Sequence, residues 1–245
     1  MANNKLAKFA DMATYKNVFQ YSFKDLQQSP FPLRGRWGEK YFKNNNPIVL
    51  ELGCGKGEYT VGLAKNYPNK NFIGIDIKGA RMWTGATEAI ENKLNNVAFV
   101  RTRIEAIANF FESDEVSEIW LTFPEPQMKR ENRRLTSCRF MRAYGKILKE
   151  NALIHLKTDS HFLYTYTKAL IKENQIELLF DTNNLYKSEI DNKDLAIQTF
   201  YERVWISRGC TIKYLRYLFS KKNEWVEPSI EIERDNYRSF SRIII

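Results

Sequence analysis

Short apolar runs alternate with helical patterns over most of the chain. The runs at residues 48–52, 71–76, 97–101, 118–123 and 152–158 are predominantly apolar, which is typical of strands buried on both faces of a sheet. Between them, the pattern predicts helices over residues 57–66, 80–94, 137–148 and 161–173. Strands that alternate with helices predict an α/β fold, with a mostly parallel sheet and helices on both faces.

The ends of the chain are less regular. Residues 1–46 show weak helical periodicity and contain the Pro- and Gly-rich stretch SPFPLRGRWG. Beyond residue 176 the alternation weakens, and residues 212–219 predict one late strand. We therefore expect a basic N-terminal extension over residues 1–46 and one domain over residues 47–245.

Composition excludes several classes of protein. With 245 residues, 43% hydrophobic and 27% charged, the chain can bury a large core and is neither disordered nor fibrous. No run reaches the roughly 18–20 apolar residues of a membrane span, and the first residues lack the apolar core of a signal peptide. Cys54, Cys138 and Cys210 are far apart, and the chain has only two histidines, His155 and His161. We expect a cytoplasmic protein without metal or membrane, as a monomer or homodimer.

Positive charge is concentrated in three segments. The formal net charge is +9. Residues 1–46 and 124–150 each have eight Lys or Arg against three acids, and residues 203–224 have six against one. Clusters of this kind favour a polyanionic partner such as RNA, although each could instead be a solvated helix face.

A glycine-rich turn gives the sharpest local signal. In LELGCGKG, residues 50–57, Gly53, Gly55 and Gly57 follow a predicted strand and open a predicted helix. Glycine allows a tight turn and close approach of a ligand, although an ordinary strand–helix turn is the alternative. The spacing is GxGxG, not the GxGxxG of dinucleotide sites, and Glu51 would repel a pyrophosphate. A cofactor with a cationic, amino-acid-like end fits better, which points to S-adenosylmethionine.

Asp76 ends the second predicted strand, 23 residues after Gly53. An acid at this position can accept hydrogen bonds from both ribose hydroxyls of an adenosyl group. Cys54 is interpreted as a small space-filling residue, because no base lies near it in the sequence.

The fourth predicted strand ends in the loop FPEPQMKRENRRL, residues 123–135. Pro124 and Pro126 stiffen this loop around Glu125. Open α/β sheets bind their ligands beyond the carboxyl ends of central strands, so this loop is a candidate substrate site. An ordinary Pro-bounded turn with a solvated basic run is the alternative.

With these motifs in order, the chain resembles the tRNA (guanine-N7-)-methyltransferase family. That family has an FPDPW-x-K loop followed by basic residues, a later TD motif and a T-x-x-E near the C-terminus. Here the matching segments are FPEPQMKRENRRL, Lys157-Thr158-Asp159 and Thr199-Phe200-Tyr201-Glu202. The resemblance spans roughly residues 47–220. It implies the class I Rossmann-like methyltransferase fold and methyl transfer from S-adenosylmethionine to N7 of guanine 46 in the variable loop of tRNA.

The resemblance also implies roles for particular residues. Glu51, Gly53, Gly55, Asp76 and Arg103 would bind the cofactor, and Glu125 would serve both the cofactor and catalysis. The residues expected at the guanosine are Lys129, Asp159, Thr199 and Glu202. RNA contacts are expected from the run Glu131, Asn132, Arg133 and Arg134.

Three positions depart from the family pattern. Arg103 stands where the family has an Asp that contacts the cofactor's adenine. Arginine cannot accept a hydrogen bond from the adenine amino group, so a neighbouring group must accept it. Glu125 replaces Asp, which extends the carboxylate by one methylene. Gln127 replaces Trp, so a stacking surface is lost.

Guanine N7 chemistry suits the residues available. N7 has an in-plane lone pair and no proton, so its methylation needs no general base such as histidine. Three other functions remain open from the residues alone: a nicotinamide-dependent oxidoreductase, an RNA-binding protein with a non-catalytic cofactor pocket, and a methyltransferase acting on an adenine amino group. The GxGxG spacing disfavours the first, and FPEP lacks the (N/D)PP(Y/F) pattern of the third.

Overall fold

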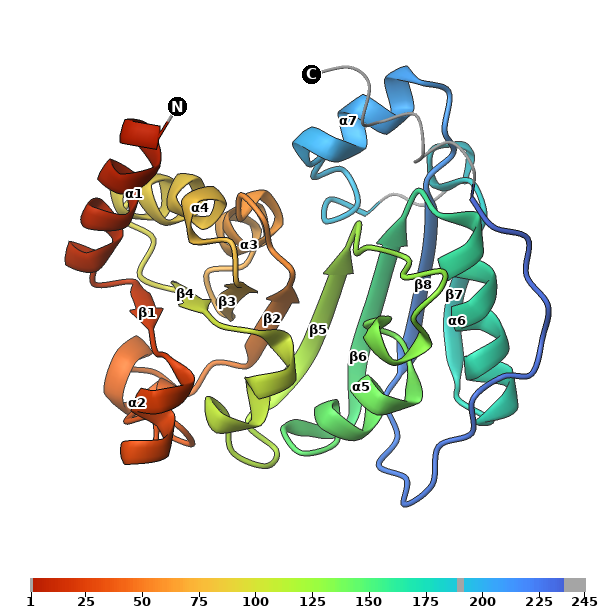
Figure 1. The fold of residues 1–245 in the computed structure, drawn as a ribbon, viewed down its shortest axis with the longest axis horizontal. Helices are drawn as coiled ribbons and strands as arrows, with labels where there is room; N and C mark the ends of the chain where they lie inside the picture. Colours follow the sequence, from red (N-terminus) through yellow and green to blue (C-terminus); the bar gives the residue numbers. More distant parts are fainter. Residues whose placement is uncertain (1, 189–191, 236–245) are drawn as a thin grey trace.

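The structure, a computed structural model, describes residues 2–188 and 192–235. In these residues the strands form one eight-stranded sheet in the order β1-β4-β3-β2-β5-β6-β8-β7 (Figure 1). The six strands from β1 to β6 run parallel, whereas β8 is antiparallel to both of its neighbours. The predicted mostly parallel sheet is confirmed. The strands are β1 Val18–Gln20, β2 Ile48–Leu52, β3 Asn71–Asp76, β4 Val97–Arg101, β5 Val116–Thr122, β6 Leu148–Thr158, β7 Leu178–Thr182 and β8 Lys213–Leu218.

Helices cover both faces of this sheet, as the helical patterns predicted. The α-helices are α1 Ala2–Thr14, α2 Phe23–Gln28, α3 Glu58–Asn66, α4 Gly79–Glu91, α5 Cys138–Tyr144, α6 His161–Glu173 and α7 Phe200–Ser207. A π-helical turn, η1 Trp37–Phe42, and the 3₁₀ turns η2 Ile104–Asn109, η3 Glu131–Arg133 and η4 Leu185–Lys187 complete the described elements.

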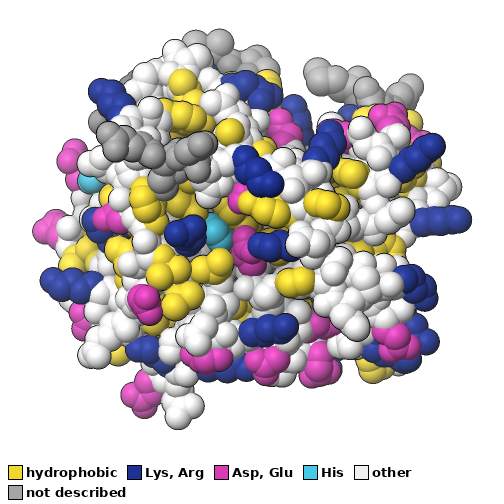
Figure 2. Space-filling model, turned by 180° about the vertical axis from the view of Figure 1, so that it is seen from behind, with side chains coloured by type: hydrophobic (Ala, Val, Ile, Leu, Met, Phe, Trp, Pro, Cys, Tyr) yellow, Lys and Arg dark blue, Asp and Glu magenta, His cyan; other side chains and the backbone are white. Residues whose placement is uncertain are grey.

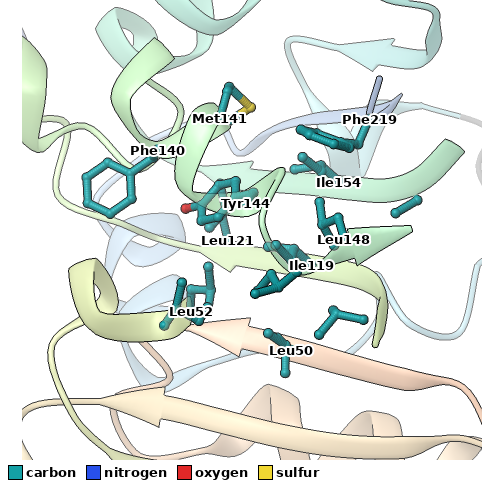
Figure 3. Close-up of a cluster of buried hydrophobic side chains, with 14 of the residues drawn as sticks. Leu50, Leu52, Ile119, Leu121, Phe140, Met141, Tyr144, Leu148, Ile154 and Phe219 are labelled. Atoms are coloured by element: carbon teal, nitrogen blue, oxygen red, sulfur yellow. The ribbon is translucent and has the colours of Figure 1, made fainter. Parts of the chain in front are cut away.

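Alternation along the strands divides the core between the two faces. On β2, Leu50 and Leu52 join the cluster under α5 and α6, which Figure 3 shows around Tyr144. The intervening Val49 joins the other cluster, with side chains of α3 and α4. Because successive strand side chains point to opposite faces, Glu51 faces α3.

Residues 1–46, expected as an extension, take part in the same fold. β1 pairs with β4 at the edge of the sheet. Trp37 is fully buried, and its indole N–H donates to the Phe110 carbonyl at 2.9 Å. Its ring stacks on Phe111, with 5.7 Å between ring centroids. The N-terminal segment therefore shares the core of the main sheet.

The predicted strands at residues 48–52, 71–76 and 97–101 begin and end where expected. The predicted helices over 80–94 and 137–148 are too long, because α4 ends at Glu91 and α5 at Tyr144. The chain passes directly from the turn after α5 into β6, which begins four residues before its predicted start at 152.

Candidate functional site

The glycine-rich turn joins β2 to α3 in a left-handed backbone conformation. Gly53, Gly55 and Gly57 have φ of 79°, 55° and 74°. A Cβ at Gly57 would come within 2.7 Å of the Phe99 ring, whereas a Cβ at Gly53 would meet nothing within 4 Å. Packing against Phe99 therefore requires glycine at position 57. At Gly53 the space beside the Cα is empty, so a ligand can approach the backbone there.

A cavity of about 500 Å³ opens beside this turn, at the carboxyl ends of the central strands. Ligands of open α/β sheets bind at this edge. The cavity brings together seven of the predicted site residues from four separate segments: Glu51, Gly53, Gly55, Asp76, Glu125, Arg133 and Thr199.

Asp76 is held rigidly at the cavity wall. Its Oδ2 accepts from the Gly55 N–H at 2.9 Å, and its Oδ1 accepts from the Lys78 N–H at 2.8 Å. Each carboxylate oxygen has a second lone pair, so both remain able to accept from a ligand. The turn and the acid thus fix each other's position.

Glu51 is a buried carboxylate behind the turn. It accepts from the Thr60 N–H at 2.8 Å and from the hydroxyls of Thr60 and Thr122. Burial raises its pKa to about 7, against the lowering effect of these hydrogen bonds. Burial also raises the pKa of the Cys54 thiol, next to Glu51 and Asp76, which leaves it protonated and unreactive.

The loop after β5 has strained backbone at two residues. Phe123 and Gln127 have φ of 51° and 47°. Arg134 donates to the carbonyls of Gln127 and Met128 at 3.3 and 3.2 Å, and its guanidinium also lies 4.4 Å from the centroid of the Tyr166 ring. These contacts fix the shape of the loop.

The burial of Arg134 changes the interpretation of the basic residues 129–134. Arg134 is 7% exposed, so its predicted RNA contact is replaced by a role in holding the loop. Lys129, Glu131, Asn132 and Arg133 are exposed, and of these only Arg133 lines the cavity. Glu125 is exposed at the cavity, and its carboxylate accepts from the Gln127 amide at 3.3 Å.

The T-x-x-E motif forms the start of α7. Thr199 Oγ1 accepts from the Glu202 N–H at 3.1 Å, and the Glu202 carboxylate accepts from the Thr199 N–H at 3.4 Å. This reciprocal pair is a capping box. Glu202 is fully buried, 2.7 Å from the Lys157 ammonium. It does not line the cavity, so its predicted direct contact with guanosine is not supported by this position.

Two other predicted residues lie outside the cavity lining. Asp159 is buried at the end of β6 and lines a separate cleft with His161 and Lys213. Arg103 is exposed in a neighbouring cleft beside Gln20. Ile104, one residue further on, lines the cavity instead.

Several residues that line the cavity were not predicted from the sequence. Ile77 directly follows the end of β3 and is 49% exposed although it is apolar, and Ile104 lies three residues after the end of β4. Tyr201 and Trp205 line the cavity from α7. The two isoleucines could have been found from their position after predicted strands, but α7 lies where the sequence pattern is weak.

Comparison with known proteins agrees with the fold. A family model described as "Putative methyltransferase" matches residues 45–215. Among solved structures, the 16S rRNA methyltransferase KamB superimposes with a TM-score of 0.56 at 14% identity, covering 82% of this chain and 94% of that one. A 16S rRNA (adenine(1408)-N(1))-methyltransferase from Catenulisporales acidiphilia with SAM has a TM-score of 0.51 at 13% identity, covering 76% and 92%. The fold is that of the class I, Rossmann-like methyltransferases.

Closer relatives define the family. A tRNA (guanine-N(7)-)-methyltransferase of Bacteroides fragilis is 55% identical over 99% of this chain and 96% of its own length. One from Porphyromonas gingivalis is 56% identical over 94% and 96%. The chain belongs to the tRNA (guanine-N(7)-)-methyltransferase family, and the protein is a methyltransferase, as the sequence motifs predicted.

The described residues contain neither a candidate metal cluster nor a helix able to span a membrane. Within residues 2–188 and 192–235 there is no group of three or more His, Cys, Asp or Glu side chains arranged to hold a metal ion. Over the same part of the chain, every helix is too short or too polar to cross a membrane.

Proposed function

We propose that the protein transfers the methyl group of S-adenosylmethionine to N7 of guanine 46 in the variable loop of tRNA. The observation that carries the proposal is the single cavity at which the open backbone of Gly53, the fixed carboxylate of Asp76 and the loop carboxylate of Glu125 meet. The names of the closely similar relatives support the same reaction. Such a reaction places the protein in the cytoplasm, with tRNA as its partner.

The residues present fit S-adenosylmethionine. Asp76 can accept from the ribose hydroxyls, while the open side of Gly53 admits the ligand against the backbone. Ile77 and Ile104 offer an apolar surface for the adenine ring. Glu51, once ionised, supplies a negative charge for the ammonium end. When bound, the cofactor supplies an electrophilic methyl group on a sulfonium.

The chain's own contribution to the reaction is positioning and electrostatics. N7 of guanine carries no proton, so no side chain has to remove one. Positive charge moves from the sulfonium to the guanine ring, and a fixed carboxylate beside that path stabilises it throughout. Glu125, on a loop held by Arg134, is placed to do this. Alignment of the two reacting groups supplies further acceleration.

Recognition of guanine requires donors and acceptors at its edges. Lys129 and Thr199 are proposed to donate to O6. Asp159 is buried and lines a separate cleft, so we assign it no direct contact with the N1–H and N2–H donors. For Glu202 we propose an indirect role in place of the predicted direct contact. Its ion pair with Lys157 anchors the start of α7, and this anchoring holds Thr199 over the cavity.

Four basic side chains at the cavity are proposed to meet phosphates of the substrate. They are Lys56, Lys78, Arg81 and Arg133, and they share the lining with the acids Glu51, Glu58, Asp76 and Glu125. Elsewhere on the molecule, Lys and Arg alternate with acidic and apolar side chains, as Figure 2 shows for the face seen from behind. Incubation of unmodified tRNA with the protein and labelled S-adenosylmethionine, followed by nucleoside analysis, tests the proposal.

A further inference from the structure

A second hollow lies between the N-terminal segment and the end of α4, away from the cofactor cavity. Its volume is about 800 Å³. Its walls come from residues 14–17, 41–43, 89–90 and 93–95, among them Lys16, Lys43 and Lys93. We call it the basic groove.

The charge of the basic groove is unbalanced. Its lining contains three lysines and no Asp or Glu. All three lysines are exposed, and none forms an ion pair with an acid in residues 2–188 or 192–235. The nearby acid Glu88 is already paired with Lys65 at 2.7 Å. Glu91, between the wall residues Ile90 and Lys93 in sequence, is exposed and is not part of the lining. The lining itself therefore carries an excess of positive charge.

The walls below the lysines are aromatic and aliphatic. Tyr41 donates its hydroxyl to the Val97 carbonyl at 2.9 Å, and the Tyr15 hydroxyl lies 2.9 Å from Thr87 Oγ1. Since these polar ends are satisfied inside the protein, the two residues line the groove as apolar walls. Ile90 is 45% exposed beside them. Aromatic walls under lysines favour an unstacked nucleotide and its phosphates.

The groove lies on the same helix as the cofactor cavity. Arg81, near the start of α4, lines the cavity, and Ile90, near its end, lines the groove. The nine-residue step from Arg81 to Ile90 corresponds to about 13 Å along the helix axis. Helix α1 lies beside α4 along this path (Figure 1). A folded RNA that reaches the cavity extends much further than this distance.

We propose that the basic groove is a second tRNA contact site, where backbone phosphates meet Lys16, Lys43 and Lys93 and an unpaired base stacks on the tyrosine walls. This inference rests on the proposed function, because it takes the same tRNA as its ligand. It assigns the groove to binding, with no part in methyl transfer.

The test is a charge-removing triple variant of the full chain, Lys16→Gln with Lys43→Gln and Lys93→Gln. A matched control, Lys146→Gln with Lys149→Gln and Lys172→Gln, removes three exposed lysines near the ends of α5 and α6. Affinity for unmodified tRNA is measured at several salt concentrations. Cofactor affinity, oligomeric state and the urea midpoint of unfolding are measured alongside.

We expect the groove variant to bind tRNA at least about tenfold more weakly, with a log–log salt slope shallower by about 2–3 units for three lost phosphate contacts. Cofactor affinity and the unfolding midpoint should stay unchanged, and the control should keep most of its tRNA affinity. As a second variant, Ile90→Glu should weaken tRNA binding without removing a lysine.

Two results would overturn the inference. One is equal tRNA affinity and salt slope in the groove variant and the control. The other is a changed oligomeric state with unchanged tRNA affinity, which would make the groove a contact between copies of this chain. Failure of the unaltered protein to methylate tRNA would instead contradict the proposed function, so the two failures can be distinguished.

Discussion

The Lys157 ammonium lies 2.7 Å from Glu202 Oε1, and both side chains are fully buried. Lys157 also donates to the carbonyls of Leu195 and Ile197 at 3.0 and 3.1 Å. Glu202 in turn accepts from the Tyr186 hydroxyl. The pair therefore fixes the chain before α7 on β6, and with it Thr199 at the cavity.

Glu202→Gln should destabilise the protein by about 3–5 kcal/mol, because it leaves the Lys157 ammonium buried without a counter-charge. Burial lowers the pKa of Lys157 and the Glu202 charge opposes this, so loss of the acid also favours the neutral amine. Urea unfolding measures the change. The double variant with Lys157→Met should lose less stability than the two single variants together. Unchanged stability with a strongly raised KM for tRNA would show that Glu202 contacts guanosine directly.

Asp76→Asn should weaken cofactor binding by about 10- to 100-fold, as expected for loss of a charged hydrogen bond worth roughly 1.5–3 kcal/mol. The amide also places N–H groups against the Gly55 or Lys78 N–H. Calorimetry with S-adenosylmethionine measures the affinity. Arg103→Ala is the matched control, because Arg103 lines a different cleft. A larger loss of cofactor affinity in Arg103→Ala than in Asp76→Asn would contradict the assignment of Asp76 to the cofactor site.

Cofactor affinity should rise as pH increases through about 7, the raised pKa of Glu51. Below this pH the cofactor-free protein keeps the Glu51 proton, which must leave before the carboxylate can pair with an ammonium. Calorimetry at pH 6.5 in two buffers of different ionisation enthalpy should detect this proton release. Glu51→Gln should abolish that part of the release and leave only the titration of the ligand's own amine. Identical proton release in both proteins would exclude the contact.

The same carboxyl has the opposite effect on the stability of the cofactor-free protein. Its pKa in the folded state, about 7, lies above the ordinary value of 4.5. Between these pH values the folded protein holds a proton that the unfolded chain has lost, so this contribution to stability falls as pH rises. Glu51→Gln should flatten the fall, which urea unfolding at a series of pH values would measure.

Glu125→Gln should slow methyl transfer by about 10²- to 10³-fold while leaving tRNA affinity nearly unchanged, as for loss of one preorganised electrostatic contact. Single-turnover rates at saturating tRNA measure the chemical step. These rates should be flat from about pH 6 to 9 in the unaltered protein, because N7 has no proton to remove. A rise with pH that disappears in Glu125→Gln would instead identify Glu125 as a general base. Glu125→Asp should retain activity.

Much of the fold could be predicted because the central strands are apolar and short. Residues 48–52 and 71–76 are buried on both faces, so hydrophobicity alone marks them. β1 has only three residues, and β7 is partly exposed, so neither carries such a pattern. Their places depend on pairing with β4 and β8, which are distant in sequence.

The site was predictable to the level of segments but not of single side chains. Arg133 and Arg134 are neighbours, yet one lines the cavity and the other is buried under the loop. Similarly, the chain turns after β4, where the Thr102 N–H donates to the Asp76 carbonyl, and Ile104 rather than Arg103 reaches the cavity. The T-x-x-E motif matches a capping box as well as the family motif, so its structural role was readable from the sequence.

The proposed methyl transfer to guanine 46 is tested most directly by nucleoside analysis of unmodified tRNA after incubation with the full chain and S-adenosylmethionine labelled in its methyl group. A transcript in which guanine 46 is replaced by adenine serves as the matched substrate control. We expect label in 7-methylguanosine from the unaltered transcript and none from the control. Label in any other nucleoside, or equal label in both transcripts, would contradict it.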